Sequence, residues 1–217
     1  TEAVGHAVRA TYLYAGIADI YAETGDKALW SSLETIWQNV VDKKMYITGG
    51  CGALHDGASP DGSKNQREIT RVHQAFGRNY QLPNATAHNE TCANIGNVLW
   101  NWRMFLASGE AKHIDTLELA LYNSVLSGVD LNGTNFFYTN PLRQSDMAPV
   151  ALRWAGGRKP FVTSFCCPPN LARTIAGVGQ YAYGKSNDTV WVNLYGSNTL
   201  DTKLIDSGHV RIEQTTG

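Results

Sequence analysis

The sequence has few of the features that mark several large classes of protein. Its net charge is only −1 at pH 7, which gives no electrostatic basis for binding nucleic acid or an anionic membrane. No apolar run approaches the roughly 20 residues that a membrane-spanning helix needs. Four cysteines among 217 residues are too few for a disulfide-stabilised scaffold. We therefore expect neither a nucleic-acid nor a membrane partner, and the sequence gives no oligomeric state.

The composition is that of a globular protein with an ample core. Hydrophobic residues make up 43% of the chain and charged residues 17%, which suits one large or two small domains. The chain opens at Thr1-Glu2, already inside a helix-like pattern, and stops just after a strand-like run. We therefore expect a piece of a longer protein, so the lack of a visible targeting segment carries little weight.

Apolar residues recur at helical spacing over most of the chain. The pattern predicts helices over 1–24, 29–41, 91–107, 114–125 and 170–183. A turn made of a hydroxyl residue, glycine and an acid separates the paired helices at 24–26 and again at 108–110. Repeated antiparallel helix pairs favour a mainly α protein built as an α/α toroid over an α/β sheet.

The last part of the chain has a different pattern. Strand-like runs follow at 190–194 and 210–212, after the polar stretch 185–188. A domain boundary is therefore predicted there, with one domain over 1–184 and the start of another over 185–217. Two long segments, 51–68 and 141–160, have the composition of loops, and loops of that length are often functional.

Two adjacent cysteines, Cys166 and Cys167, stand before two prolines. A disulfide between neighbouring cysteines closes a strained eight-membered ring, so soft-metal ligation suits these thiols better. Glu90 and Cys92 supply a carboxylate and a third thiol, which together make a plausible four-ligand zinc shell. The alternative is four unrelated buried cysteines. His88 is either a rival ligand or a hydrogen-bonding neighbour of the shell.

Several motifs give the chain a resemblance to a known family. The Glu-Thr-Cys motif at 90–92 and the Cys-Cys-Pro-Pro-Asn motif at 166–170 are the most specific of them. In family order, these and other motifs resemble glycoside hydrolase family 127, the β-L-arabinofuranosidase family, at 3–9, 44–50, 73–77, 82–84, 89–93, 119–123, 137–141 and 165–170. The resemblance implies an (α/α)6 barrel followed by β-sandwich domains. This chain would hold the second half of the barrel, 1–184, and the first strands of a sandwich, 185–217.

The resemblance also implies roles for individual residues. Zinc would be bound by Glu90, Cys92, Cys166 and Cys167, with Cys166 at the position of the family's nucleophile. Zinc keeps a bound sulfur as thiolate, and a thiolate can attack an anomeric carbon. A retaining glycosidase ordinarily uses two carboxyl groups, and here a cysteine would replace one of them.

Two further residues match substrate-facing positions of the family. His6 matches a substrate-binding histidine, and Tyr138 matches a tyrosine close to the nucleophile. Without the resemblance, His6 would be interpreted as a helix-surface residue and Tyr138 as a strand-packing residue. The implied partner is a carbohydrate, an L-arabinofuranoside, and reduced zinc thiolates favour a cytoplasmic setting.

One position departs from the family pattern. Gln74 stands where the family has the glutamate that serves as general acid/base, and an amide cannot transfer the catalytic proton. The chain is then a Glu→Gln variant, a naturally degenerate member, or one in which another acid such as Glu68 has taken over. An insertion over about 57–69 would reshape the rim of the pocket.

Two other functions compete with a zinc-dependent retaining glycosidase. Gln74 favours a non-catalytic carbohydrate-binding module that keeps the zinc site as structure. A thiol redox protein centred on Cys166 and Cys167 is the third hypothesis, but the sequence lacks the Cys-x-x-Cys motif of such proteins.

Overall fold

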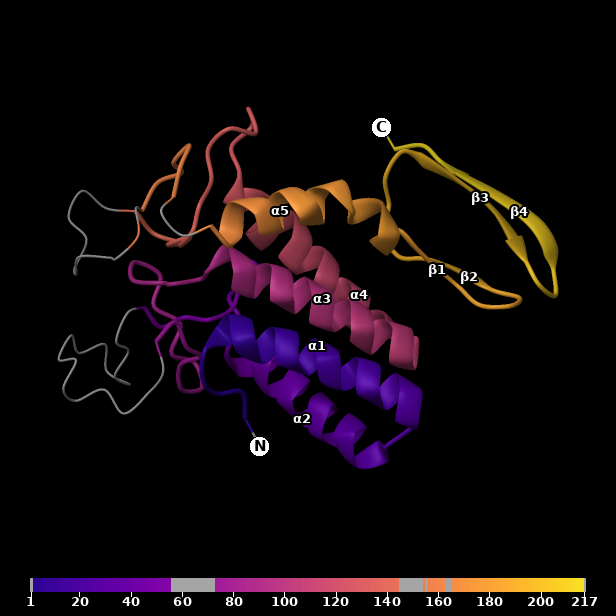
Figure 1. Ribbon diagram of the computed structural model, residues 1–217, viewed down its shortest axis with the longest axis horizontal. Coiled ribbons are helices and arrows are strands. Elements are labelled where there is room, and N and C mark those ends of the chain that lie inside the picture. Colours follow the sequence, from indigo (N-terminus) through magenta and orange to yellow (C-terminus); the bar gives the residue numbers. More distant parts are fainter. Residues whose placement is uncertain (1, 56–72, 145–153, 155, 163–164, 217) are drawn as a thin grey trace. The chain divides into compact units, whose positions relative to one another are not determined.

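The computed structural model describes residues 2–55, 73–144, 154, 156–162 and 165–216 (Figure 1). The chain divides into two compact units, Thr1–Arg173 and Thr174–Gly217. Helices dominate the first unit, which confirms the prediction of a mainly α protein. Within the described part of the chain, no helix combines the length and the apolar character that crossing a bilayer requires.

The first helix pair confirms the predicted turn at 24–26. Helix α1, Ala7–Thr24, ends where Gly25 takes a left-handed conformation (φ 68°), which glycine adopts without steric cost. Helix α2, Lys27–Lys43, begins at Asp26, whose side chain accepts hydrogen bonds from the next two free backbone amides. The predicted start of α1 at Thr1 was wrong, because the backbone at Gly5 and Ala7 instead pairs with residues 74–76.

The second helix pair repeats the left-handed glycine at the turn, but Glu110 makes no side-chain cap. Helix α3, Thr91–Ser108, ends at Gly109 (φ 70°), and α4 spans Ala111–Leu119. The chain then continues as a π-helix, η1, Ala120–Val125, and a 3₁₀ turn, η2, Leu126–Gly128. The predicted helix through residue 125 is therefore present, but its last part is wound more loosely than an α-helix.

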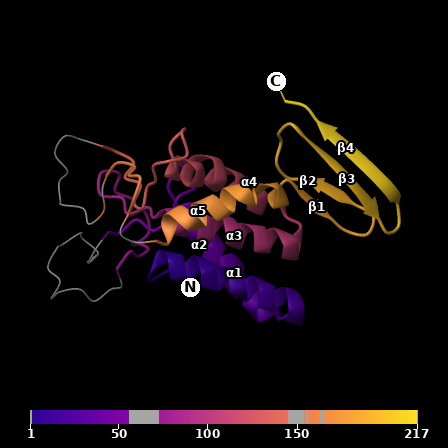
Figure 2. The ribbon, with the colours of Figure 1, turned by 45° about the horizontal axis from the view of Figure 1, so that its top comes forward.

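Helices α1 and α3 pack side by side, with their N-terminal ends at the same end of the unit (Figures 1 and 2). Small residues permit close approach, because a Cβ built at Gly96 of α3 would lie 2.1 Å from the Thr11 hydroxyl oxygen of α1. The core beneath this contact is aromatic: the Tyr14 and Trp100 rings lie 4.9 Å apart. This packing fixes the start of α3 against the start of α1.

Extended segments connect at the same end of the helices. The backbone N–H of Thr91 donates to the carbonyl of Tyr138 at 3.0 Å, and Glu90 forms an isolated bridge with Thr139. The run over 136–138 follows the turn at Gly133 (φ 72°). The start of α3 is thereby tied to the segment that carries Tyr138.

Helix α5, Cys167–Ala176, begins three residues earlier than predicted. Proline suits the first turn of a helix, because its fixed φ is helical and its missing N–H would be unpaired there. Pro168 and Pro169 therefore lie inside the first turn, and the backbone N–H of Asn170 already donates to the Cys166 carbonyl at 3.2 Å. The helix also ends earlier than predicted and is followed by a 3₁₀ turn, η3, Val178–Tyr181.

The second unit contains two antiparallel strand pairs. Strands β1, Tyr183–Lys185, and β2, Val190–Val192, form one pair, and β3, Asn198–Leu204, and β4, Gly208–Gln214, form the other. The predicted strands at 190–194 and 210–212 correspond to β2 and β4. Strands β1 and β3 were missed. Strand β1 has only three residues and overlaps the end of the helix predicted over 170–183. Strand β3 reads Asn-Thr-Leu-Asp-Thr-Lys-Leu and lacks the apolar alternation of a half-buried strand. The boundary at 184/185 stays a prediction.

Candidate metal centre and active site

The candidate site is built from the beginnings of three helices. His6, Glu90 and Cys167 stand at the starts of α1, α3 and α5, respectively, and Cys92 lies in the first turn of α3. The unpaired amides of a helix N-terminus give it a partial positive charge. Anions such as a carboxylate or a thiolate are therefore stabilised at this end of the unit.

The structure brings the four predicted ligands together. One ligand atom from each of Glu90, Cys92, Cys166 and Cys167 lies within 4.8 Å of all the others. The Cys166 and Cys167 sulfurs are 3.8 Å apart, and they lie 3.7 and 3.6 Å, respectively, from Oε1 of Glu90. All four cysteines are free thiols.

These distances fit a tetrahedral metal ion. With Zn–S bonds of about 2.3 Å and a Zn–O bond of about 2.1 Å, tetrahedral angles place two sulfurs about 3.8 Å apart and a sulfur and an oxygen about 3.6 Å apart. Three thiols and a carboxylate are ligands that zinc accepts. The donor set therefore fits zinc in both chemistry and spacing.

Burial makes the cluster unfavourable for uncompensated negative charge. The hydrogen bond with Cys166, reinforced by burial, raises the pKa of Cys92 to about 12. Burial, followed by the bond to Cys166, also raises the pKa of Cys167. A cation reverses this balance, because a coordinating thiol is deprotonated outright. Of the three thiols, only that of Cys166 belongs to an exposed residue.

Glu90 is held by a second layer of polar residues. Nε2 of His88 lies 3.2 Å from Oε2 of Glu90, and Nδ1 of His88 lies 3.5 Å from the Thr139 hydroxyl. His88 is therefore a hydrogen-bonding neighbour of the four-residue cluster and not one of its members. Asn89, between the two, has a left-handed φ of 42°, a conformation that costs of order 1 kcal/mol or more outside glycine.

The Cys92 side of the cluster has a partner that the sequence analysis missed. The Asn170 amide donates to the Cys92 sulfur at 3.4 Å and to the Tyr12 hydroxyl at 2.8 Å. Asn170 was part of the quoted motif at 166–170, but helical spacing gave it no more than a place near the start of a helix. Nothing in the sequence indicates that α1 brings Tyr12 to this point.

His6 and Gln74 are brought together by backbone pairing. The Ala7 amide donates to the Gln74 carbonyl at 2.9 Å, and His6 bridges to Ala75. Gln74 has a left-handed φ of 55°, and its side chain hydrogen-bonds His6. Burial lowers the pKa of His6, although the negative charge of Glu90 opposes that shift. Both residues therefore lie in the neighbourhood of the cluster.

Tyr138 packs directly against the thiols. It shares a buried cluster with Cys92 and Cys167, and its ring stacks on Trp154 with centroids 4.1 Å apart. Burial and the Glu90 charge raise the pKa of Tyr138, so its hydroxyl stays protonated at neutral pH. Glu68 and the insertion over 57–69 lie outside the described residues.

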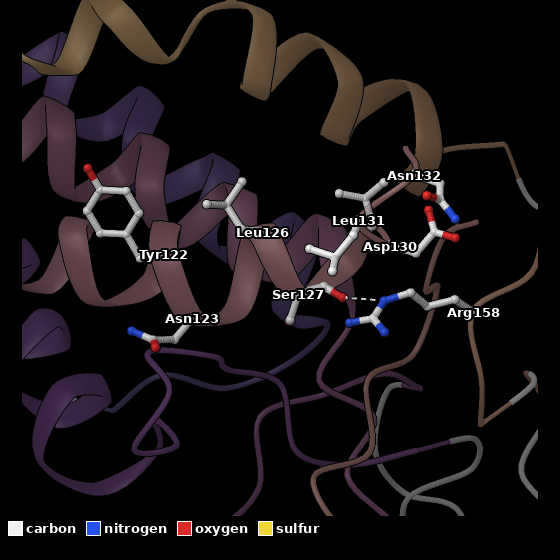
Figure 3. Close-up of a pocket in the computed structure, with 9 residues that line it drawn as sticks. Tyr122, Asn123, Leu126, Ser127, Asp130, Leu131, Asn132 and Arg158 are labelled. Carbon is white, nitrogen blue, oxygen red and sulfur yellow. Dashed lines mark hydrogen bonds between the residues drawn. The ribbon is translucent and has the colours of Figure 1, made fainter. Parts of the chain in front are cut away.

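A separate pocket of about 600 Å³ lies along η1, η2 and the segment that follows them (Figure 3). Its lining includes Tyr122, Leu131 and Asp130, and Nε of Arg158 donates to the Ser127 carbonyl at 2.9 Å. The Asp130 carboxylate already accepts hydrogen bonds from residues 134 and 135. None of the predicted site residues lines this pocket, so the cysteine cluster is the better candidate.

Comparisons with known proteins agree with this choice. The family profile described as "Beta-L-arabinofuranosidase, GH127 catalytic domain" matches residues 1–180. A curated relative, the non-reducing end β-L-arabinofuranosidase of Bifidobacterium longum subsp. longum, is 31% identical over 202 residues, which cover 91% of this chain and 28% of that protein.

Solved structures give the same result. A glycoside hydrolase aligns with a TM-score of 0.91 and 55% identity, over 99% of this chain and 36% of its own. A GH127 β-arabinofuranosidase aligns with a TM-score of 0.84 and 46% identity, over 100% of this chain and 30% of that protein. A GH127 β-L-arabinofuranosidase from Geobacillus stearothermophilus T6 aligns with a TM-score of 0.83 and 38% identity, over 99% of this chain and 32% of that protein. The chain thus spans about a third of the length of these relatives, and it belongs to glycoside hydrolase family 127.

Proposed function

We propose that this chain is part of a zinc-dependent retaining glycoside hydrolase that releases β-linked L-arabinofuranose. The observation that carries the proposal is the four-ligand cluster, in which Cys166 is exposed while Glu90, Cys92 and Cys167 are buried. A purely structural zinc site has no need of a ligand on an exposed residue, whereas a nucleophile must reach its substrate. Three of the relatives named above are arabinofuranosidases.

Glu90, Cys92, Cys166 and Cys167 would hold the metal, which supplies the positive charge that keeps the sulfurs as thiolates. Every other role falls to the protein. His88 orients the Glu90 carboxylate through the contact at 3.2 Å. The converging helix starts add to the stabilisation of negative charge at Cys166.

The proposed reaction has two displacements at one carbon. The Cys166 sulfur attacks the anomeric carbon, the bond from that carbon to the leaving oxygen breaks, and the leaving oxygen takes a proton. Water then attacks the same carbon, loses a proton, and expels Cys166 as thiolate. Two inversions give overall retention. His6 and Tyr138 would hold the sugar through its hydroxyl groups beside this sulfur.

Gln74 leaves the proton transfers without a carboxylic acid at the expected position. An amide neither donates nor accepts the catalytic proton at neutral pH. The chain is therefore a Glu→Gln variant, a degenerate member of the family, or one in which another acid serves. The first displacement on a substrate with a good leaving group needs this proton least.

A non-catalytic carbohydrate-binding module is the second candidate function, and Gln74 is the observation that favours it. The polar residues His6 and Tyr138 would then bind sugar, while the metal cluster would act only as structure. The exposure of Cys166 is the observation against it.

The fold that we propose for the whole protein follows the family. Residues 1–184 would form the second half of an (α/α)6 barrel, and 185–217 the first strands of a β-sandwich. The antiparallel pairs α1–α2 and α3–α4 and the strand pairs after Tyr183 support this arrangement. Because the relatives are about three times longer, the remaining barrel helices would come from outside the chain.

Mass spectrometry tests the proposed function. The whole protein that contains this chain is kept reduced, analysed for zinc, and mixed with an aryl β-L-arabinofuranoside. We expect about one zinc per chain and a covalent pentosyl adduct that maps to Cys166. A zinc-loaded protein that binds arabinofuranosides without forming an adduct would support the binding module. Protein without metal, in samples never exposed to chelator or oxidant, would contradict both.

A further inference from the structure

Asn170 lies where α5 meets both α1 and the metal cluster. It is the fourth residue of α5, only 8% of its surface is exposed, and its side chain reaches two other helices. Its amide nitrogen is 3.4 Å from the Cys92 sulfur and 2.8 Å from the Tyr12 hydroxyl oxygen, and its amide oxygen is 2.6 Å from Nη2 of Arg173.

The orientation of this amide follows from its partners. Arginine can only donate hydrogen bonds, so the atom that faces Arg173 must be the amide oxygen, and the NH₂ group must face the sulfur. One of its two hydrogens then points to the Tyr12 oxygen and the other to Cys92. Both N–H donors and the oxygen of the side chain are therefore engaged, and its position is fixed from three sides.

We infer that Asn170 is a positioning residue of the metal centre. Its side-chain N–H holds the Cys92 thiolate in place and withdraws negative charge from the sulfur. The inference rests on the proposed metal site. An N–H donor withdraws negative charge from a thiolate, and Arg173 strengthens that donor by polarising the amide. Outer partners of metal ligands typically contribute about 10–100-fold to metal affinity.

Two substitutions separate this role from simple packing. Asn170→Asp keeps the shape and the acceptor for Arg173 but places an oxygen against the sulfur. Asn170→Leu removes all polar atoms at similar volume. Tyr12→Phe is the matched control, because it removes one neighbour of Asn170 and leaves the N–H to sulfur contact intact.

The test measures zinc affinity by chelator competition and the sulfur-to-metal charge-transfer band of the cobalt-substituted protein. We expect both Asn170 variants to lose about 10–100-fold in zinc affinity and to shift the cobalt band to longer wavelength, because the thiolate becomes more electron-rich. Tyr12→Phe should leave the band where it is in the parent protein.

Unchanged zinc affinity and an unchanged band in both Asn170 variants would overturn the inference. Weaker binding with a lower melting temperature but no band shift would also overturn it, because that result indicates packing alone. A parent protein that binds neither metal would refute the proposed metal site itself, and the inference with it. That failure is distinguishable, since it occurs before any substitution is made.

Discussion

Two glycines in neighbouring helices should respond in opposite ways to the same substitution. Gly16 lies within α1 and Gly96 within α3. A Cβ at Gly16 meets nothing within 4 Å, but a Cβ at Gly96 would lie 2.1 Å from the Thr11 hydroxyl oxygen and 2.9 Å from Cδ2 of Tyr12. Gly→Ala within a helix gains about 0.5–1 kcal/mol from backbone entropy. Gly16→Ala should therefore stabilise the protein by about that amount.

The same gain is outweighed at Gly96. Thr11 cannot easily turn away, because its side chain is fully buried and its hydroxyl donates to the carbonyls of Ala7 and Val8 at 3.0 Å. Ordinary carbon contacts are about 3.5–4.0 Å, so α1 and α3 must move apart. Overpacking of this kind costs about 1–3 kcal/mol. At the upper end of that range, the net destabilisation by Gly96→Ala is about 2 kcal/mol.

Thermal unfolding followed by circular dichroism measures both effects. For a protein of this size each kcal/mol moves the midpoint by roughly 2–4 °C, so Gly96→Ala should lower it by several degrees and Gly16→Ala should raise it slightly. A midpoint raised equally by both substitutions would refute the close contact between α1 and α3.

Three further predictions concern the site and the pH dependence of stability. Cys166→Ser should abolish glycosidase turnover, whereas Cys51→Ser, at a buried cysteine outside the cluster, should leave it nearly unchanged; equal losses in a kinetic assay would contradict the assigned roles. Gln74→Glu should raise the rate on substrates with poor leaving groups by about 10²–10⁴-fold, and a zinc-loaded variant without any gain would remove position 74 from acid/base catalysis. Burial lowers the pKa of His113 to about 4, so as the pH falls this histidine is protonated in the unfolded chain before it is protonated in the folded one. The free energy of unfolding should therefore decrease by about 3 kcal/mol as the pH falls from about 6.5 to about 4. His113→Phe should flatten that part of a denaturation series, and an unchanged slope would show that His113 is not responsible.

Local patterns in the sequence were enough to predict most of the helices. The spacing of apolar residues and the turns at 24–26 and 108–110 depend on neighbours a few residues away, and α1 to α4 follow them closely. The predicted helix ends were less accurate where a segment distant in the sequence pairs with the chain. Residues 5–7 pair with 74–76, a contact that no local pattern indicates, and this pairing delays the start of α1.

The ligand types of the metal cluster were also evident in the sequence. Adjacent cysteines cannot pair without strain, and the Glu-Thr-Cys motif offers the missing donors. The spacing of the ligands could not be predicted, because Glu90 and Cys166 are 76 residues apart and only the tertiary fold brings the starts of α3 and α5 together. A sequence indicates which atoms can bind a metal, whereas the fold decides whether they lie at the distances that tetrahedral coordination requires.

The surroundings of the cluster were decided entirely by the tertiary structure. Asn170, Tyr12 and Arg173 are ordinary residues of two helices, and nothing in their spacing sets them apart. They meet because the start of α5 lies beside α1 and the start of α3, where the Asn170 side-chain amide donates to the Tyr12 hydroxyl and to the Cys92 sulfur. The chemistry of the donor atoms was therefore determined by sequence, and their distances and hydrogen-bond partners by packing between helices that are remote in the chain.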